Sequence, residues 1–203
     1  MEANFAEKDG DTRQHYNNVR LPIAVPVTDR VQEKQSSMQK KKAYQFSFRK
    51  LGGNGVIRLS DFSDKVILIV NVASHCNATT KEYIELNRLA QQYPELVIIG
   101  CPCNQFGHQE NLNGEEILTS LKYIRPGNNF TPNFELTEKI EVNGAKAHPL
   151  YNHLRLSLPF PSDRTLIDDM AKPGGFYTHP MRIVWMPISR TDVSWNFEKV
   201  CFQ

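Results

Sequence analysis

Two apolar runs, separated by a periodic stretch, stand out in the middle of the chain. Residues 65–73 read KVILIVNVA, with no polar side chain between Lys65 and Asn71, and residues 96–100 read LVIIG. Runs of β-branched residues without polar alternation are typical of strands that are buried on both faces. We therefore expect two strands in the interior of a parallel or mixed sheet.

The stretch between these runs predicts an amphipathic helix from Thr79 to Tyr93. Thr79 or Thr80 can serve as its N-cap, and Pro94 closes its far end. The order strand, helix, strand within about 36 residues predicts a βαβ unit with a right-handed crossover. The helical assignment rests on apolar side chains at three- and four-residue intervals: Tyr83, Leu86, Leu89 or Ala90, and Tyr93.

Shorter patterns on both sides complete an α/β fold. Residues 43–48 and 56–59 flank a glycine-rich turn at 51–55, which predicts a hairpin. Helices are expected over 115–123 and 149–158, and further strands over 181–185 and after Trp195. The expected architecture is a central mixed sheet flanked by helices.

Charge divides the chain into an extension, residues 1–42, and a body, residues 43–203. The extension holds eight Lys/Arg and six Asp/Glu, whereas the body holds sixteen of each and is formally neutral. A neutral body argues against a nucleic-acid-binding domain, which normally has a clustered cationic face. With 40% apolar and 10% aromatic residues the chain can build a core. We expect a flexible N-terminal extension and one folded domain.

Several classes of protein are disfavoured by what the patterns lack. No apolar run reaches the roughly 18 residues of a membrane span. Residues 1–18 are polar and acidic before any apolar stretch, unlike a secretory signal, so we expect a cytoplasmic protein. Four cysteines are too few for a disulfide-stapled module. The spacing of Cys101 and Cys103 does not match a zinc site, and no metal is expected.

Cys76 lies at the junction of the first buried strand and the helix. In an α/β sheet this junction faces the crevice where ligands bind. Free backbone N–H groups and the helix dipole stabilise a thiolate there, and the thiolate is the reactive species. A lone cysteine can also be a small buried filler. The polar neighbours Asn77, Thr79 and Thr80 favour a partly exposed, functional loop instead.

Three separated blocks of sequence resemble the glutathione peroxidases. The blocks read NVASHCNAT at 71–79, CPCNQFGHQE at 101–110 and DVSWNFEK at 192–199. The similarity runs from about Tyr44 to Lys199 and includes LKYIRP at 121–126 and VNGAKAHPL at 142–150. The resemblance implies a thioredoxin-like fold, which agrees with the βαβ prediction.

The resemblance also implies a set of catalytic residues. The family's peroxidatic position, often selenocysteine, falls on Cys76, its glutamine on Gln109, and its Trp-Asn pair on Trp195 and Asn196. The amides and the indole N–H are donors that can stabilise a sulfur anion and a leaving oxygen anion. Core packing is the alternative for a tryptophan, and Trp185 keeps that interpretation. Gln105 is interpreted as a structural hydrogen bonder.

The implied activity is reduction of hydrogen peroxide and organic hydroperoxides by glutathione through a Cys76 sulfenic acid. Glutathione is a co-substrate, and no other cofactor is expected. A reductant thiol converts the sulfenic acid to a mixed disulfide, and a second thiol restores Cys76. Arg125 can contact the carboxylates of glutathione through a bidentate fork. A solvent-exposed loop arginine is the alternative, and both stay open.

The chain departs from the family pattern at several positions. Asn77 replaces a usual glycine, and asparagine tolerates the positive φ that a glycine position can have. Cys101 replaces a usual aromatic residue. Cys101 can in principle pair with Cys103 or Cys76, but its spacing to Cys103 gives no easy bridge geometry. The helix after Glu110 lacks the resolving cysteine of thioredoxin-dependent relatives, which favours glutathione.

The end of the chain and one loop complete the expectations. Relatives continue past the last block, whereas this chain ends at Gln203, so a C-terminally shortened member is expected, lacking its final packing elements. The loop at 125–134 resembles a subunit contact of the oligomeric branch, which implies a homotetramer and small peroxides as substrates. The loop at 173–179 has no assigned role. A redox sensor or truncated isoform with little turnover is the alternative function.

Overall fold

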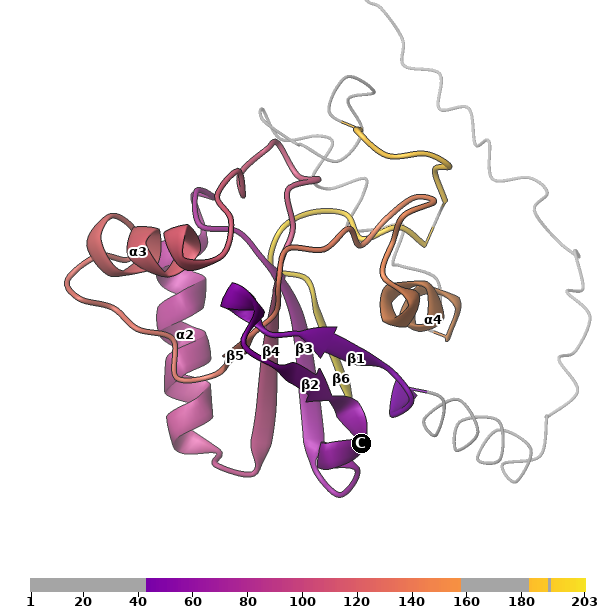
Figure 1. Cartoon of the computed structure of the whole chain (residues 1–203), viewed down its shortest axis with the longest axis horizontal. Helices are drawn as coiled ribbons and strands as arrows, with labels where there is room; N and C mark the ends of the chain where they lie inside the picture. The colour runs from indigo at the N-terminus through magenta and orange to yellow at the C-terminus, as the bar shows by residue number, and fades with distance from the viewer. Residues whose placement is uncertain (1–42, 158–182, 190) are drawn as a thin grey trace, which may run out of the picture.

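A four-stranded mixed sheet forms the centre of the protein (Figure 1). The computed structural model describes residues 43–157, 183–189 and 191–203. The strand order is β5-β4-β3-β6, in which β3 (Val66–Val72), β4 (Leu96–Pro102) and β5 (Glu135–Leu136) run parallel. Strand β6 (Lys199–Phe202) pairs antiparallel with β3. The two predicted buried strands therefore lie side by side at the centre.

In the part of the chain that the structure describes, three helices and a hairpin surround this sheet. The helices are α2 (Thr79–Gln92), α3 (Glu115–Tyr123) and α4 (Pro149–Ser157). The hairpin pairs β1 (Ser47–Arg49) with β2 (Val56–Arg58), and the short 3-10 turns η1 (Leu51–Gly53) and η2 (Leu59–Phe62) follow the two strands. Helices flank a mixed sheet, as expected, so the α/β, thioredoxin-like fold class is confirmed. Among the described residues no helix is long and apolar enough to cross a membrane.

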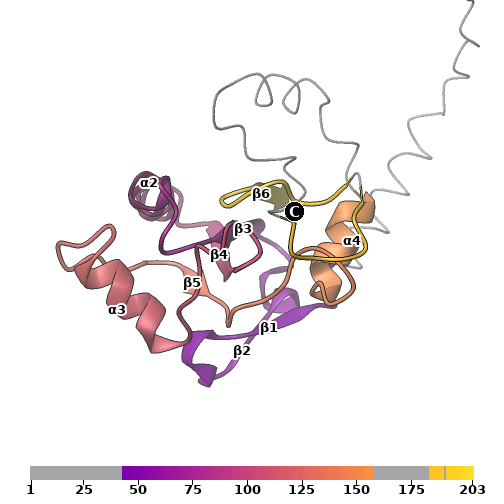
Figure 2. The ribbon, with the colours of Figure 1, turned by 90° about the horizontal axis from the view of Figure 1, so that it is seen from above.

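The alternation of side chains along β3 supplies two separate cores. Ile67 and Ile69 point to one face, where they pack with the hairpin and α4, whereas Leu68 and Val70 point to the other face, towards α2 and α3. Figure 2 shows α2 and α3 on one side of the sheet and α4 on the opposite side. Burial on both faces explains why the sequence of β3 lacks polar alternation.

The start of α2 differs from the prediction. The residue before the helix is Ala78, and no side chain caps its first N–H groups. Thr79 is the first helical residue, and its hydroxyl donates instead to the Ala73 carbonyl at 2.7 Å. The N-cap prediction for Thr79 or Thr80 is therefore wrong, because the hydroxyl of Thr79 ties the helix back to the end of β3. Tyr93 ends the helix, with its N–H donating to the Leu89 carbonyl.

The remaining sequence predictions are mostly confirmed. The hairpin, the helix over 115–123 and the strand after Trp195 are present, and the helix from Pro149 reaches Ser157, with Leu158 outside the described residues. Of the strand predicted over 181–185, residues 183–185 have no regular secondary structure, and the first two are not described. The extension at 1–42 and the loop at 173–179 also lie outside the described residues.

Helix α4 offers a matched test of the core. Leu150 is fully buried, whereas Leu156, six residues later, is 83% exposed. We expect Leu150→Ala to lower the free energy of unfolding by about 3 kcal/mol, because the truncation leaves a cavity. Leu156→Ala should change it by less than about 0.5 kcal/mol. Urea unfolding followed by circular dichroism measures both, and equal effects would contradict the placement of α4.

Candidate active site

Cys76 lies in the turn between the carboxyl end of β3 and the start of α2. The N–H of Thr79 donates to its carbonyl at 3.1 Å, which closes the turn. His75 and Asn77 are exposed, but Cys76 itself is only 5% exposed and packs in the α2-facing core. The thiol is thus more buried than the polar neighbours suggested. Asn77 is not among the described residues with positive φ, so replacing glycine strains no backbone here.

Gln109 and Asn196 form a direct hydrogen bond although they are far apart in the sequence. Nδ2 of Asn196 donates to Oε1 of Gln109 at 2.9 Å. Asn196 is buried, and its Oδ1 atom has no hydrogen-bond partner. The bond occupies the acceptor end of the Gln109 amide, so the donor end, Nε2, is the part that can meet an anion.

The Gln109 segment is joined to the Cys76 turn through the backbone. The N–H of His75 donates to the Gln109 carbonyl at 3.0 Å. This bond places Gln109 beside the residue that precedes Cys76. The structure therefore brings the Cys76 turn, Gln109 and Asn196 into one neighbourhood.

Trp195 is held beside the same segment. Its ring packs against Phe106, with centroids 5.8 Å apart, and its carbonyl accepts a hydrogen bond from Nδ2 of Asn71 at 2.8 Å. Gly107 has φ +64°, and a Cβ there would lie 3.3 Å from the Trp195 ring. A glycine is needed at this position because the backbone is left-handed and the indole is close. Trp195 thus packs on the turn that leads to Gln109.

Arg125 contacts the Cys76 turn directly. Its Nη1 atom donates to the carbonyl of Cys76 at 3.0 Å and to that of His75 at 3.4 Å. Neither of the two earlier interpretations foresaw these contacts. Arg125 is half-buried, and its guanidinium holds the backbone of the turn from the side of α3.

Glu110 is the buried charge that the sequence interpretation did not single out. Its carboxylate is fully buried and accepts two hydrogen bonds from Ser74, one from the N–H at 2.8 Å and one from the hydroxyl at 2.7 Å. Burial raises the pKa of Glu110 to about 7, although the bonds from Ser74 and the charge of Lys139 oppose the rise. The sequence held one signal for this residue: Glu110 directly follows Gln109 and is the one acidic residue between positions 101 and 114.

The other cysteines lie away from Cys76. Cys101 and Cys103 are buried in the core on the α4 side of the sheet, whereas Cys76 is in the core on the α2 side. Burial raises the pKa of both Cys101 and Cys103 to about 12, so they are inert thiols. Cys201 on β6 is exposed, and all four cysteines are free. No cluster of His, Cys, Asp or Glu within the described ranges is arranged to hold a metal ion.

Gln105 and Trp185 have the structural positions that were predicted. Oε1 of Gln105 accepts the N–H groups of Val142 and Asn143, and its Nε2 donates to the Asn143 carbonyl. Trp185 packs against Phe106, and its indole N–H donates to Asp192. Both side chains therefore hold loops around the core.

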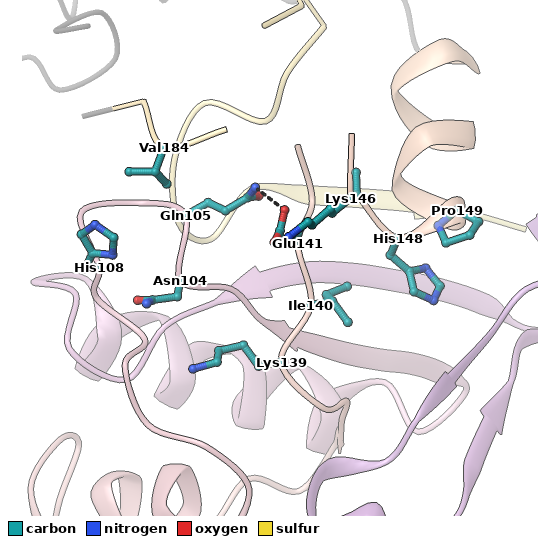
Figure 3. Close-up of a pocket in the computed structure, with 11 residues that line it drawn as sticks. Asn104, Gln105, His108, Lys139, Ile140, Glu141, Lys146, His148, Pro149 and Val184 are labelled. Atoms are coloured by element: carbon teal, nitrogen blue, oxygen red, sulfur yellow. Dashed lines mark hydrogen bonds between the residues drawn. The ribbon is translucent and has the colours of Figure 1, made fainter. Parts of the chain in front are cut away.

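A cavity of about 700 Å³ is lined by side chains from residues 104–108 and 139–149 and by Val184 (Figure 3). Cys76 is not among the residues that line it. Most of its polar groups already have partners. Lys139 donates to the carbonyls of residues 110, 111 and 112, and Nδ1 of His148 accepts the N–H of Leu150. Gln105 is held by the 142–143 backbone. Most polar groups that line the cavity are therefore engaged in holding the surrounding loops.

Comparison with known proteins shows the family of the chain. The family model described as glutathione peroxidase matches residues 43–155. The chain is 50% identical over 166 residues to glutathione peroxidase 1 of Rattus norvegicus, covering 81% of this chain and 79% of the rat protein. It is 51% identical over 158 residues to the Bos taurus protein of the same name, covering 77% and 73%. A solved structure, Trgpx in apo form, is 29% identical with a TM-score of 0.45 and covers 78% of this chain and 76% of that chain. The chain belongs to the glutathione peroxidase family.

Proposed function

We propose that this chain reduces hydrogen peroxide and organic hydroperoxides with Cys76 as the nucleophile. The observation that carries the proposal is the hydrogen bond between Asn196 and Gln109 beside the Cys76 turn. It orients the Gln109 amide so that its N–H groups can stabilise the sulfur anion and the oxygen anion that leaves the peroxide. Trp195, packed on the adjoining turn, is proposed to supply a further donor through its indole N–H.

The first step transfers one oxygen atom from the peroxide to sulfur. The Cys76 thiolate attacks the terminal peroxide oxygen, the O–O bond breaks, and the leaving oxygen takes a proton and departs as water or an alcohol. Sulfur is oxidised to sulfenic acid and the peroxide is reduced. The buried position of Cys76 excludes bulk water and strengthens the effect of the donors around it.

Glutathione is the proposed reductant, as the family membership supports. One glutathione thiol condenses with the sulfenic acid, releasing water and leaving a mixed disulfide. A second glutathione attacks that disulfide, which releases oxidised glutathione and restores the Cys76 thiol. Cys101 and Cys103 lie on the opposite face of the sheet, so an external thiol rather than either of them resolves the sulfenic acid.

The deciding experiment is a glutathione reductase-coupled assay on the full chain. Peroxide-dependent loss of NADPH at many turnovers per enzyme would support the proposed peroxidase. One equivalent of Cys76 sulfenic acid without turnover would instead favour the redox-sensor hypothesis. Two further proposals are a homotetramer with contacts at residues 125–134, which the resemblance supports, and a cytoplasmic location, which the polar pattern of residues 1–18 supports.

Arg125 is proposed to contact a carboxylate of glutathione in addition to the two carbonyls. We expect Arg125→Met to raise the KM for glutathione about tenfold, since a hydrogen bond to a charged group contributes roughly 1.5–3 kcal/mol. Lys122→Met, which removes a neighbouring cation on α3, is the control and should leave the KM unchanged. Steady-state kinetics with varied glutathione measure both. An unchanged KM with slower peroxide reduction would restrict Arg125 to holding the turn.

A further inference from the structure

We propose that Glu110 is a positioning residue whose ionised carboxylate clamps the Cys76 turn against the Gln109 segment, so that peroxide reduction depends on the charge of Glu110. This inference rests on the proposed function, since it deepens the role of the same site. The clamp joins the end of β3 to residues 109–110, which include Gln109, the proposed donor to the Cys76 sulfur.

Both oxygens of the Glu110 carboxylate hold one residue of the turn. Oε2 accepts the Ser74 N–H at 2.8 Å and Oε1 accepts the Ser74 hydroxyl at 2.7 Å. Ser74 is two residues before Cys76, and Glu110 directly follows Gln109. The N–H of His75 donates to the Gln109 carbonyl, so three hydrogen bonds link the two segments side by side. Moving Glu110 would therefore shift the nucleophile relative to its donor.

Glu110 is itself fixed by groups outside the turn. Its N–H donates to Oδ1 of Asn104 at 3.0 Å, and its carbonyl accepts a hydrogen bond from Nζ of Lys139 at 3.1 Å. A carboxylate that is anchored in this way can position Ser74 without moving. The bonds to the carboxylate are charge-assisted, which makes them stronger than neutral hydrogen bonds.

The surroundings of Glu110 determine when the clamp is ionised. The titratable groups that face it are Lys139, whose charge favours the carboxylate, and the buried Tyr83 and Cys103, which are neutral near pH 7. His75 is linked to Glu110 through the Ser74 hydroxyl, which lies 2.9 Å from Nδ1 of His75. Because burial raises the pKa of Glu110 to about 7, the carboxylate is formed as the pH rises through 7 and is lost as the pH falls.

Protonation reverses the direction of one hydrogen bond in the clamp. A protonated Glu110 must donate its O–H, and the acceptor in reach is Oγ of Ser74, 2.7 Å from Oε1. In the ionised clamp the Ser74 hydroxyl proton is donated to Oε1, so the Nδ1–H of His75, 2.9 Å from Oγ, donates to that oxygen. When Glu110 takes the hydroxyl proton, the Nδ1 proton passes to Oγ, the new Ser74 hydroxyl donates to the bare Nδ1, and Nε2 of His75 takes a proton from solvent. The exposed His75 ring thus connects the buried carboxyl to solvent, and the proton can reach Glu110 along this chain of three groups.

The experiment compares two reactions of Cys76 over pH 6–9. One is the second-order rate of peroxide reduction in a single turnover, and the other is the rate of alkylation by iodoacetamide, which reports the thiolate. Dividing the rate of peroxide reduction by the rate of alkylation cancels the thiolate fraction of Cys76. The ratio then reports how well Cys76 is positioned relative to its donor. The full chain carries Cys201→Ser so that the exposed Cys201 thiol does not consume the alkylating agent.

In the parent the ratio should rise with pH, with an inflection near 7. Glu110→Gln should be flat and about tenfold lower at pH 8, since a misplaced reactive pair loses up to about 100-fold. Ser74→Ala keeps the N–H bond but loses a bond that lowers the pKa of Glu110, so its inflection should move above 7. Glu95→Gln, at an exposed site, is the matched control and should match the parent. A flat ratio in the parent would overturn the proposal.

A second measurement keeps the clamp testable apart from peroxide chemistry. Hydrogen exchange of the peptide covering residues 74–77 at pH 8 should be about tenfold faster in Glu110→Gln than in the parent, because one charge-assisted bond to the Ser74 N–H is weakened. Equal exchange would overturn the clamp. If the parent alkylates normally and exchanges slowly but leaves peroxide intact, the proposed peroxidase function fails while the clamp stands. If Glu110→Gln does not fold, Ser74→Ala is the deciding variant. An inflection of its rate ratio above pH 7 would support the clamp, and an unchanged inflection would overturn it.

Discussion

Replacing Cys76 by serine is expected to lower the rate of peroxide-dependent NADPH oxidation by at least about 1,000-fold, the scale on which enzymes lose activity with their nucleophile. A serine hydroxyl has nearly the same size, so the packing of this 5% exposed side chain is retained. It is not ionised at neutral pH and does not attack the peroxide oxygen. The coupled assay with hydrogen peroxide measures this loss directly.

The matched control for this change is Cys201→Ser. Cys201 is exposed on β6 and lies away from the site, so its replacement should leave the rate within experimental error. Circular dichroism should show a cooperative melting transition for both variants. Residual turnover in Cys76→Ser comparable to that of the parent would mean that another group is the nucleophile.

Removing the side chain of Gln109 is expected to lower the rate of peroxide attack by about 100-fold, the size of effect seen when one donor to a developing anion is lost. Gln109→Ala deletes the donor and also leaves Nδ2 of Asn196 without its acceptor. The rate is measured in a single turnover with limiting peroxide, so that the glutathione steps do not contribute.

A double-mutant cycle with Asn196 tests whether the two amides act as one unit. Asn196→Ala should lower the rate by about tenfold, because its role is to orient Gln109, and the double variant should be no slower than Gln109→Ala alone. Gln92→Ala, at the exposed end of α2, is the control and should retain the parent rate. Additive losses would show that Asn196 acts on the substrate independently of Gln109.

The βαβ unit and the place of Cys76 could be predicted because they depend on strong local patterns. The sequence of β3 is apolar on both faces, and the helical repeat of α2 is carried by large side chains such as Tyr83 and Leu86, both buried in the structure. The place of Cys76 between a strand and a helix then follows from the topology. The hairpin and α3 were predictable for the same reason, since their boundaries are marked by glycines at 53, 55 and 114.

The contacts that hold the site could not be predicted, because they join residues distant in sequence. Ser74 and Glu110 are 36 positions apart, and Arg125 is 49 positions from the Cys76 carbonyl that it contacts. Neither pair has a local signature. Thr79 shows the same limit at short range. Its hydroxyl could cap the N–H groups of the helix or donate to a nearby carbonyl, and in the packed structure it donates to the carbonyl of Ala73.

The antiparallel pairing of β6 with β3 has a consequence for how the protein acquires reactivity. Trp195 and Asn196 lie just before β6, and the carbonyl of Trp195 is held by Asn71, 124 positions earlier in the chain. Such long-range contacts close large loops and form slowly during folding. We therefore expect the Cys76 thiol to be in place during folding before Asn196 docks and orients Gln109. The full rate of peroxide reduction should then be reached only after the segment before β6 has docked, so the rate of this reaction reports the completion of folding.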